Sequence, residues 1–238
     1  MRIDVVTLLN NPSEATISQR KDLISSYASP GTEIRIVIPQ GLPPSIDSIA
    51  EMEFAAPGIL KRVIQSEQEG ADAVIIWGGH DPSLLSARSL VDIPVLAPGT
   101  ASMHIASLLA DMFCLLVQVP EAEPIAWRQI RDYGLEKKCS GVYSFGVISA
   151  SLGDPEHYPH VKETVISSID AGADAVCFGC MALNWHADRL IEEVSVERPG
   201  ALVIHPGKIT IKLAELLVDG MLTQSRLSYP KPTNPKTL

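Results

Sequence analysis

Short apolar runs alternate with amphipathic segments along the first hundred residues. Residues 2–9 form a nearly continuous apolar run, which is typical of a strand buried on both faces of a parallel sheet. Residues 56–69 instead place four aliphatic side chains on one helical face. These periodicities predict strands at 2–9, 33–39, 73–77 and 93–96, and helices at 14–27, 56–69 and 84–90.

The second half of the chain repeats this plan. The pentapeptide Gly-Ala-Asp-Ala-Val occurs at 70–74 and again at 172–176, an offset of 102 residues. One strand later, Val95–Gly99 matches Val203–Gly207 at an offset of 108, so the second copy contains an insertion between Cys180 and Val203. The repeat predicts strands at 141–148, 173–178 and 202–204, and helices at 161–171 and 184–194.

Alternating strands and helices with short connections predict parallel sheets covered by helices on both faces. Together with the duplication, they predict an α/β protein of two pseudo-symmetric lobes, with the active site in the cleft between them. We expect lobe 1 at residues 1–98, completed by a C-terminal helix at 206–227, and lobe 2 at residues 99–205. The proline-rich tail, 228–238, is expected to be disordered or to lie as an arm over a neighbour.

Charge excludes several classes of partner. The formal net charge is −9, and Lys and Arg form no basic stripe. This argues against nucleic acid or an anionic membrane as the main partner and leaves a small-molecule substrate. Asp4 interrupts the first apolar run, which therefore does not resemble a signal peptide, and no apolar segment is long enough to span a bilayer. We expect a cytoplasmic protein.

Cys180 is the strongest of four cysteines as a candidate for chemistry; the others are Cys114, Cys139 and Cys177. A disulfide framework is not expected in a chain of this size that is expected to be cytoplasmic. Cys177-x-x-Cys180 has a spacing found in zinc and redox sites, but zinc needs further ligands and Cys177 falls inside a strand. We therefore expect no metal site.

The position of Cys180 favours reactivity, because it lies where a strand is predicted to turn into a helix. The amides and dipole of a helix start favour a thiolate. The same amides, at Met181 and Ala182, could hold a substrate carboxylate or enolate oxygen. The alternative is that Cys180 is a small buried hydrophobe, as most free cysteines are.

The matching strand end in the first half has no thiol, because the 102-residue offset places Gly78 opposite Cys180. His80 is a candidate second base, since the unperturbed pKa of histidine suits proton transfer. Gly78 and Gly79 permit backbone to approach a ligand closely. Asp81 is either a substrate contact or, with the proline after it, the N-terminal cap of helix 84–90, and the cap is the favoured interpretation.

Three further polar residues lie at predicted strand or helix ends. Asn10 follows the first strand, and His205 follows the last one. Thr100 stands where it could cap a helix or bind a substrate oxygen. Each is therefore a candidate for substrate binding.

With these features the sequence resembles the hydantoin racemase branch of the aspartate/glutamate racemase superfamily. The matching segments cover nearly the whole chain: Asn10–Pro12, Pro44–Ser48, Phe54–Leu60, Gly70–Leu84, Val91–Val95, Tyr133–Glu136 and Gly179-Cys180. The resemblance implies two α/β lobes, no metal or organic cofactor, and a homo-oligomer. It adds Ser45 and Ile46 to the expected substrate contacts, which otherwise are Asn10, Gly78, Gly79, Asp81, Thr100, Met181, Ala182 and His205.

The resemblance also implies two cysteines that face each other across the cleft, one removing the α-proton and the other returning a proton to the opposite face. The second carries over to Cys180, whereas the first falls at Gly78, which departs from the pattern. A lone cysteine in the second lobe, with glycine in the first, resembles arylmalonate decarboxylase, in which the thiol protonates an enolate formed by loss of carbon dioxide.

Three hypotheses follow. The leading one is a cofactor-independent racemase or isomerase that acts at the carbon α to a carbonyl of a hydantoin or amino-acid derivative. In it, Cys180 is one acid/base group and His80, or a water held there, is the other. The first alternative is a one-base decarboxylase or lyase that uses Cys180. The second is a small-molecule binding protein without catalysis.

Overall fold

The computed structural model describes residues 1–233, and the chain divides into two compact units. Unit 1 comprises Met1–Trp77, Asp81–Ala97 and the chain from Thr210 onward, and unit 2 comprises Gly78–His80 and Pro98–Ile209. Each unit is built on one four-stranded parallel sheet, which confirms the predicted α/β class and the two parallel sheets. No helix among the described residues is long and apolar enough to cross a membrane.

Unit 1 carries the sheet with strand order β2-β1-β3-β4. Its elements are β1 (Arg2–Thr7), α1 (Glu14–Ser25), β2 (Glu33–Val37), α2 (Ile49–Gln68), β3 (Ala73–Trp77), α3 (Leu84–Leu90) and β4 (Val95–Leu96). Val6, Val74 and Ile76 point to one face of the sheet and form a core with α2 and α3. The central strands are buried on both faces, which explains their continuous apolar sequences.

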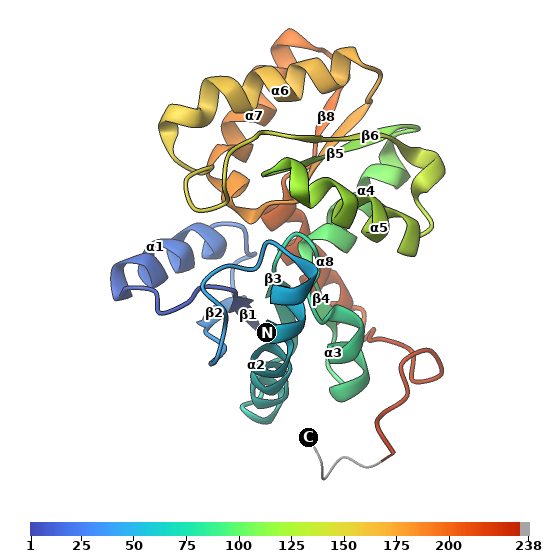
Figure 1. Cartoon of the computed structure of the whole chain (residues 1–238). Coiled ribbons are helices and arrows are strands. Elements are labelled where there is room, and N and C mark those ends of the chain that lie inside the picture. The colour runs from blue at the N-terminus through green and yellow to red at the C-terminus, as the bar shows by residue number, and fades with distance from the viewer. Residues whose placement is uncertain (234–238) are drawn as a thin grey trace. The chain divides into compact units, whose positions relative to one another are not determined.

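Unit 2 carries the sheet with strand order β6-β5-β7-β8. Its helices are α4 (Pro98–Leu109), η1 (Pro120–Ala122), α5 (Glu123–Asp132), η2 (Glu136–Lys138), η3 (Pro155–His157), α6 (Tyr158–Asp170), η4 (Met181–Leu183), α7 (Asn184–Glu197) and α8 (Pro206–Asp219), the last of which continues into unit 1. Its strands are β5 (Phe113–Val117), β6 (Cys139–Ser144), β7 (Ala175–Phe178) and β8 (Leu202–Val203). Figure 1 shows α6 and α7 on one face of this sheet and α4 and α5 on the other.

The two sheets have the same strand order, as the duplication in the sequence predicts. Both sheets place the first strand of the unit between the second and third, so β1, β2, β3 and β4 correspond to β5, β6, β7 and β8. The insertion in the second copy is found in α7, which has 14 residues where α3 has 7. Extra turns of a surface helix lengthen the second copy without disturbing the strand that ends before Cys180.

Helix α2 begins at Ile49, seven residues before the predicted start at 56. Ser48 and Glu51 form a reciprocal capping box that fixes the earlier start. Pro57 lies inside the helix, where it has no backbone N–H to donate. Strand β6 likewise ends at Ser144, four residues before the predicted end.

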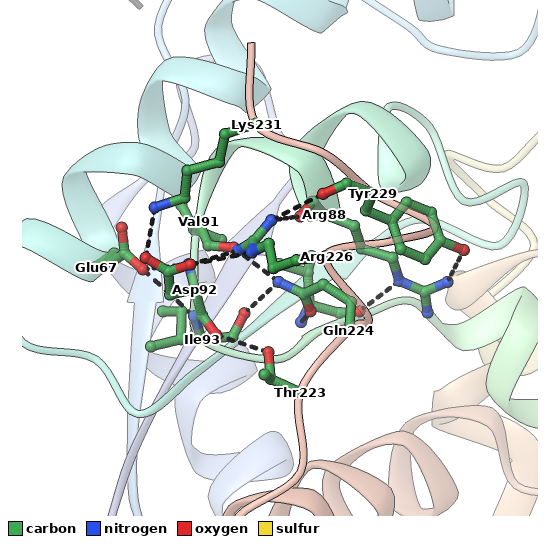
Figure 2. Close-up of polar contacts among 11 residues, drawn as sticks. Glu67, Arg88, Val91, Asp92, Ile93, Thr223, Gln224, Arg226, Tyr229 and Lys231 are labelled. Atoms are coloured by element: carbon green, nitrogen blue, oxygen red, sulfur yellow. Dashed lines mark hydrogen bonds and ion pairs between the residues drawn. The ribbon is translucent and has the colours of Figure 1, made fainter. Parts of the chain in front are cut away.

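The C-terminal segment packs along α3 and the turn before β4, all within unit 1 (Figure 2). Gln224 donates to the carbonyl oxygens of Val91 and Ile93 at 2.8 and 2.9 Å and accepts from the Val95 amide at 3.3 Å. Asp92 is paired with two cations of this segment, Arg226 at 2.8 Å and Lys231. Within the predicted tail, Tyr229 and Lys231 therefore contact unit 1 of their own chain, whereas residues 234–238 lie outside the described residues.

Candidate functional site

Cys180 emerges at the carboxyl edge of the unit 2 sheet, two residues after the end of β7. Strand β7 lies between β5 and β8, and α/β proteins bind ligands at this edge of a sheet. Cys180 is the N-terminal cap of η4, a single turn that leads directly into α7. Only 6 % of the residue is exposed, and it packs with Leu152 and Leu183 in the core beneath α6 and α7.

A serine hydroxyl lies next to the Cys180 thiol. Ser149 Oγ is 3.5 Å from Cys180 Sγ, with geometry in which the thiol can donate to the hydroxyl. Ser149 is half-buried and belongs to the segment that follows β6. Sequence reasoning did not single out Ser149, because a serine in a loop of Ser, Ala and Gly carries no signal of its own.

A second backbone segment packs directly on Cys180. Gly79 follows β3 in the sequence, but the Gly78–His80 segment belongs to unit 2. A Cβ atom on Gly79 would lie 2.0 Å from the carbonyl oxygen of Gly179 and 3.1 Å from the amide nitrogen of Cys180. Only glycine fits at such a distance, so Gly79 is required for close packing against the cysteine segment.

Gln129 of α5 holds the same glycine. Its Nε2 donates to the Gly79 carbonyl oxygen at 3.1 Å, and the residue is only 7 % exposed. His80 is half-buried and follows Gly79 directly. The predicted candidates Cys180, Gly78, Gly79 and His80 are therefore brought into one region of unit 2, whereas Gln129 was not found from sequence because a glutamine on an amphipathic helix has no distinctive pattern.

Asn184 joins the turn after Cys180 to the start of α8. Its Nδ2 donates to the Met181 carbonyl oxygen at 2.7 Å, and its Oδ1 accepts from the Gly207 amide at 3.0 Å. Met181 and Ala182, the first two residues of η4, are both half-buried. The first amides of a helical turn have no acceptor within that turn, so these two can bind a substrate oxygen.

His205 caps α8. Its Nδ1 accepts from the backbone amide of Lys208, three residues later, at 3.2 Å. Burial lowers the pKa of His205 to about 4, so the imidazole is neutral near pH 7 and can act as this acceptor. Substrate binding by His205 stays a prediction, as does binding by Thr100, which is half-buried in the first turn of α4 and whose carbonyl oxygen bonds His104 Nδ1 at 2.9 Å.

Three of the expected substrate contacts lie in unit 1, at the loops after β1 and β2. Asn10 is exposed beyond the end of β1. Ser45 donates to the Glu51 carboxylate at 3.0 Å and so supports the start of α2, while Ile46 packs against the core. Their binding roles remain predictions.

Asp81, a further expected contact, is buried in unit 1, but its favoured interpretation as a helix cap is wrong. Ser83 occupies the cap position, and α3 begins at Leu84. Both Asp81 and Ser83 have left-handed backbone conformations, with φ of 53° and 61°. The chain therefore makes an additional turn between β3 and α3, and the proline after Asp81 lies outside the helix.

The remaining cysteines are buried structural residues. Cys177 points to the opposite face of the sheet from Cys180, where its thiol lies 3.6 Å from the Ser102 carbonyl oxygen. Burial raises the pKa of Cys114 to about 12 and of Cys139 to about 11, and raises that of Cys177 well above its usual value. All four thiols are free, and no group of three or more His, Cys, Asp or Glu side chains within residues 1–233 is placed to hold a metal ion.

Comparisons with known proteins agree along nearly the whole chain. The family model described as Asp/Glu/Hydantoin racemase matches residues 8–214. A hydantoin racemase from Pseudomonas sp. (strain NS671) is 29 % identical over 98 % of this chain and 92 % of its own length. Allantoin racemase from Klebsiella pneumoniae has a similar structure, with a TM-score of 0.88, 26 % identity, and coverage of 98 % of this chain and 94 % of that one.

A decarboxylase shares the fold at lower similarity. The crystal structure of arylmalonate decarboxylase aligns with a TM-score of 0.65 and 13 % identity, covering 92 % of this chain and 93 % of that one. At this identity the likeness concerns the fold alone.

Proposed function

Since the chain belongs to the Asp/Glu/hydantoin racemase family and is therefore an isomerase, we propose that it racemises a hydantoin-type cyclic imide without a cofactor. Relatives along the full chain are named hydantoin racemase and allantoin racemase. Allantoin is itself a hydantoin that carries a ureido group. The carbon between the ring amide and the ring carbonyl is the acidic position in both, and it is the atom whose configuration would change.

The observation that carries the proposal is the position of Cys180. Its thiol lies at the carboxyl edge of a parallel sheet, where a helical turn begins, and within 3.5 Å of a hydroxyl. A thiolate there would take the proton from the ring carbon, which breaks the C–H bond, forms an S–H bond and leaves the electron pair delocalised over the carbonyl as an enolate. The amides of Met181 and Ala182 are suited to hold the enolate oxygen.

Racemisation needs a second group that returns a proton to the opposite face of the planar intermediate. Gly78, which corresponds to Cys180 in the duplication, has no side chain to do this. We propose His80 for this role, because Gly79 packs against the cysteine backbone and His80 is the next residue. Histidine exchanges protons readily near neutral pH.

The second candidate is a one-base decarboxylase or lyase, and Gly78 is the observation that favours it. With a single thiol, the site can protonate an enolate on one face without removing a proton from the other. Loss of carbon dioxide from a substituted malonate would generate such an enolate, and Cys180 would then deliver the proton. Because the chain belongs to a family of isomerases, a purely binding role is not retained.

Hydrogen exchange in D₂O separates the two candidates. Each enantiomer of 5-substituted hydantoins and of allantoin is incubated with the protein, and the ring C–H signal is followed by NMR and the optical activity by circular dichroism. The proposal expects exchange and racemisation from both enantiomers above the rate without protein. Exchange of one enantiomer alone, or carbon dioxide release from substituted malonates, would point to the one-base enzyme.

Two substitutions assign the acid/base groups. Replacing Cys180 by Ala should lower the rate about 10²- to 10⁴-fold, the usual contribution of a positioned acid/base group. His80→Asn keeps a polar planar side chain but does not titrate. It should slow racemisation of both enantiomers, while hydrogen exchange is retained by the one enantiomer whose proton Cys180 removes. If Cys180→Ala retains full activity, the central assignment is wrong.

The proposal includes the predicted cytoplasmic location and homo-oligomeric state. The resemblance to this family supports the homo-oligomer, and the charged residue within the first apolar run supports the location. Sedimentation of the purified chain at several concentrations tests the assembly, and a purely monomeric species would contradict it.

A further inference from the structure

The segment from Phe145 to Gly153 brings the Ser149 hydroxyl to the Cys180 thiol, at 3.5 Å. It begins where β6 ends and still follows β5 by backbone hydrogen bonds. The Phe145 amide donates to the Val117 carbonyl oxygen at 3.0 Å, and the Val147 amide donates to the Gln118 carbonyl oxygen at 2.9 Å. The first half of the segment is therefore fixed to the neighbouring strand.

The second half of the segment is fixed to the turn that Cys180 begins. Leu152 is fully buried and packs with Cys180 and Leu183. A Cβ atom on Gly153 would lie 3.1 Å from the Ala182 carbonyl oxygen and 2.9 Å from the Trp185 ring, so the two backbones are closely packed. The turn η4 therefore contacts both Cys180 and the segment that carries the Ser149 hydroxyl.

Two histidines complete this attachment. His186 of α7 bonds the Leu152 carbonyl oxygen through Nε2 at 3.1 Å, and His160 of α6 bonds the Phe145 carbonyl oxygen through Nε2 at 2.8 Å. Burial lowers the pKa of His186, so the imidazole remains neutral and donates N–H near pH 7. The position of Ser149 is therefore set by contacts at both ends of its segment.

We propose that Ser149 is a catalytic residue whose hydroxyl stabilises the thiolate form of Cys180. A serine hydroxyl can rotate, so it accepts from the neutral thiol and donates to the thiolate. When Cys180 takes a proton from a substrate carbon, the S–H bond that forms turns the hydroxyl from donor to acceptor, and the reverse step restores it. The effect on turnover rests on the proposed function, whereas the effect on the thiol does not.

The buried cysteines of the same unit show why such a donor matters. Burial disfavours a charged sulfur, and it raises the pKa of Cys114 to about 12 although the Ser168 hydroxyl opposes the shift. Cys180 is nearly as buried, at 6 % exposure. A hydroxyl that donates to the sulfur offsets part of the desolvation, because hydrogen bonds to charged groups are the stronger class.

Alkylation of the native full-length chain by iodoacetamide over a range of pH tests the proposal. Cys180→Ala identifies the signal of Cys180 by difference, and burial raises the pKa values of the other three thiols. In Ser149→Ala the midpoint of the pH profile should move up by about one unit, with an about tenfold lower alkylation rate at neutral pH. If hydantoin racemisation is present, kcat should fall more than KM rises.

Two variants separate the hydroxyl from the segment. Ser149→Thr retains a hydroxyl and should keep a midpoint close to that of the original protein. Ser151→Ala removes a hydroxyl two residues away and should leave the profile unchanged. An unchanged midpoint in Ser149→Ala, or an equal shift in Ser149→Thr or Ser151→Ala, would overturn the proposal. These readouts hold whether or not the chain acts on hydantoins, so a failure of the proposed function is recognised separately by absent turnover.

Discussion

Replacing Gly79 by Ala tests whether close backbone packing sets the geometry around Cys180. The new methyl carbon would lie 2.0 Å from the Gly179 carbonyl oxygen and 2.4 Å from its carbonyl carbon. Real Cβ atoms essentially never come closer than 3.0 Å to another atom, so one of the two backbones must move by about 1 Å. Neither partner is a flexible side chain, and the displacement falls on the peptide that precedes Cys180.

The expected consequences follow from that displacement. Overpacking of this kind costs about 1–3 kcal/mol of unfolding free energy, which lowers the melting temperature by roughly 2–12 °C in a chain of this size. A misplacement of about 1 Å at reacting groups can reduce turnover about 10²-fold. Differential scanning calorimetry measures the first effect, and the rate of hydantoin racemisation measures the second.

Gly172→Ala is the matched control. Gly172 lies in the same unit with φ of +110° and no atom within 4 Å of a Cβ placed on it, so alanine there adds backbone strain without a contact. It should destabilise unit 2 by about 1–2 kcal/mol while leaving turnover near the original value. If Gly79→Ala keeps the original melting temperature and rate, or if both variants lose turnover equally, the reasoning about packing at Gly79 is refuted.

Three further outcomes are expected. Gln129→Leu leaves the Gly79 carbonyl oxygen without its buried donor, which should cost about 1–3 kcal/mol in urea unfolding and reduce turnover; an unchanged rate would show that this bond does not position the site. Gln224→Ala removes three hydrogen bonds to the turn before β4 and should cost about 1–3 kcal/mol without changing kcat, whereas a fall in kcat at full stability would contradict a purely structural role. The pKa of His205 is lowered in the folded state to about 4 from an unfolded value of 6.5, so its contribution to stability is fully present above pH 6.5 and is lost as the pH falls toward 4, by roughly 2–3 kcal/mol. His205→Asn can still cap Lys208 and should flatten this part of the stability profile measured by urea titration, and an identical profile would exclude His205 as its source.

The fold class and most strands followed from periodicity, because residues buried on both faces of a parallel sheet have a distinctive sequence. The strand at 73–77 and the helix at 84–90 were predicted with the bounds that the structure shows. Strand β5 and helix α5 were not assigned, although β5 corresponds to β1 in the duplication. The start of α2 was missed because the prediction followed the apolar pattern, which marks only the buried turns, and did not use the capping-box pattern of Ser48 and Glu51.

The sequence alone determined that a cysteine would end a strand in the second half and that glycine would stand at the corresponding place in the first. Local patterns carry that information, because strand, turn and helix start are encoded within a few residues. Only the tertiary structure decided which groups surround Cys180. Ser149 lies 31 residues away and Gln129 acts through Gly79, 50 residues away. No local pattern marks such contacts, because they arise when separate segments pack on one sheet edge, and the same serine or glutamine elsewhere would be an ordinary surface residue.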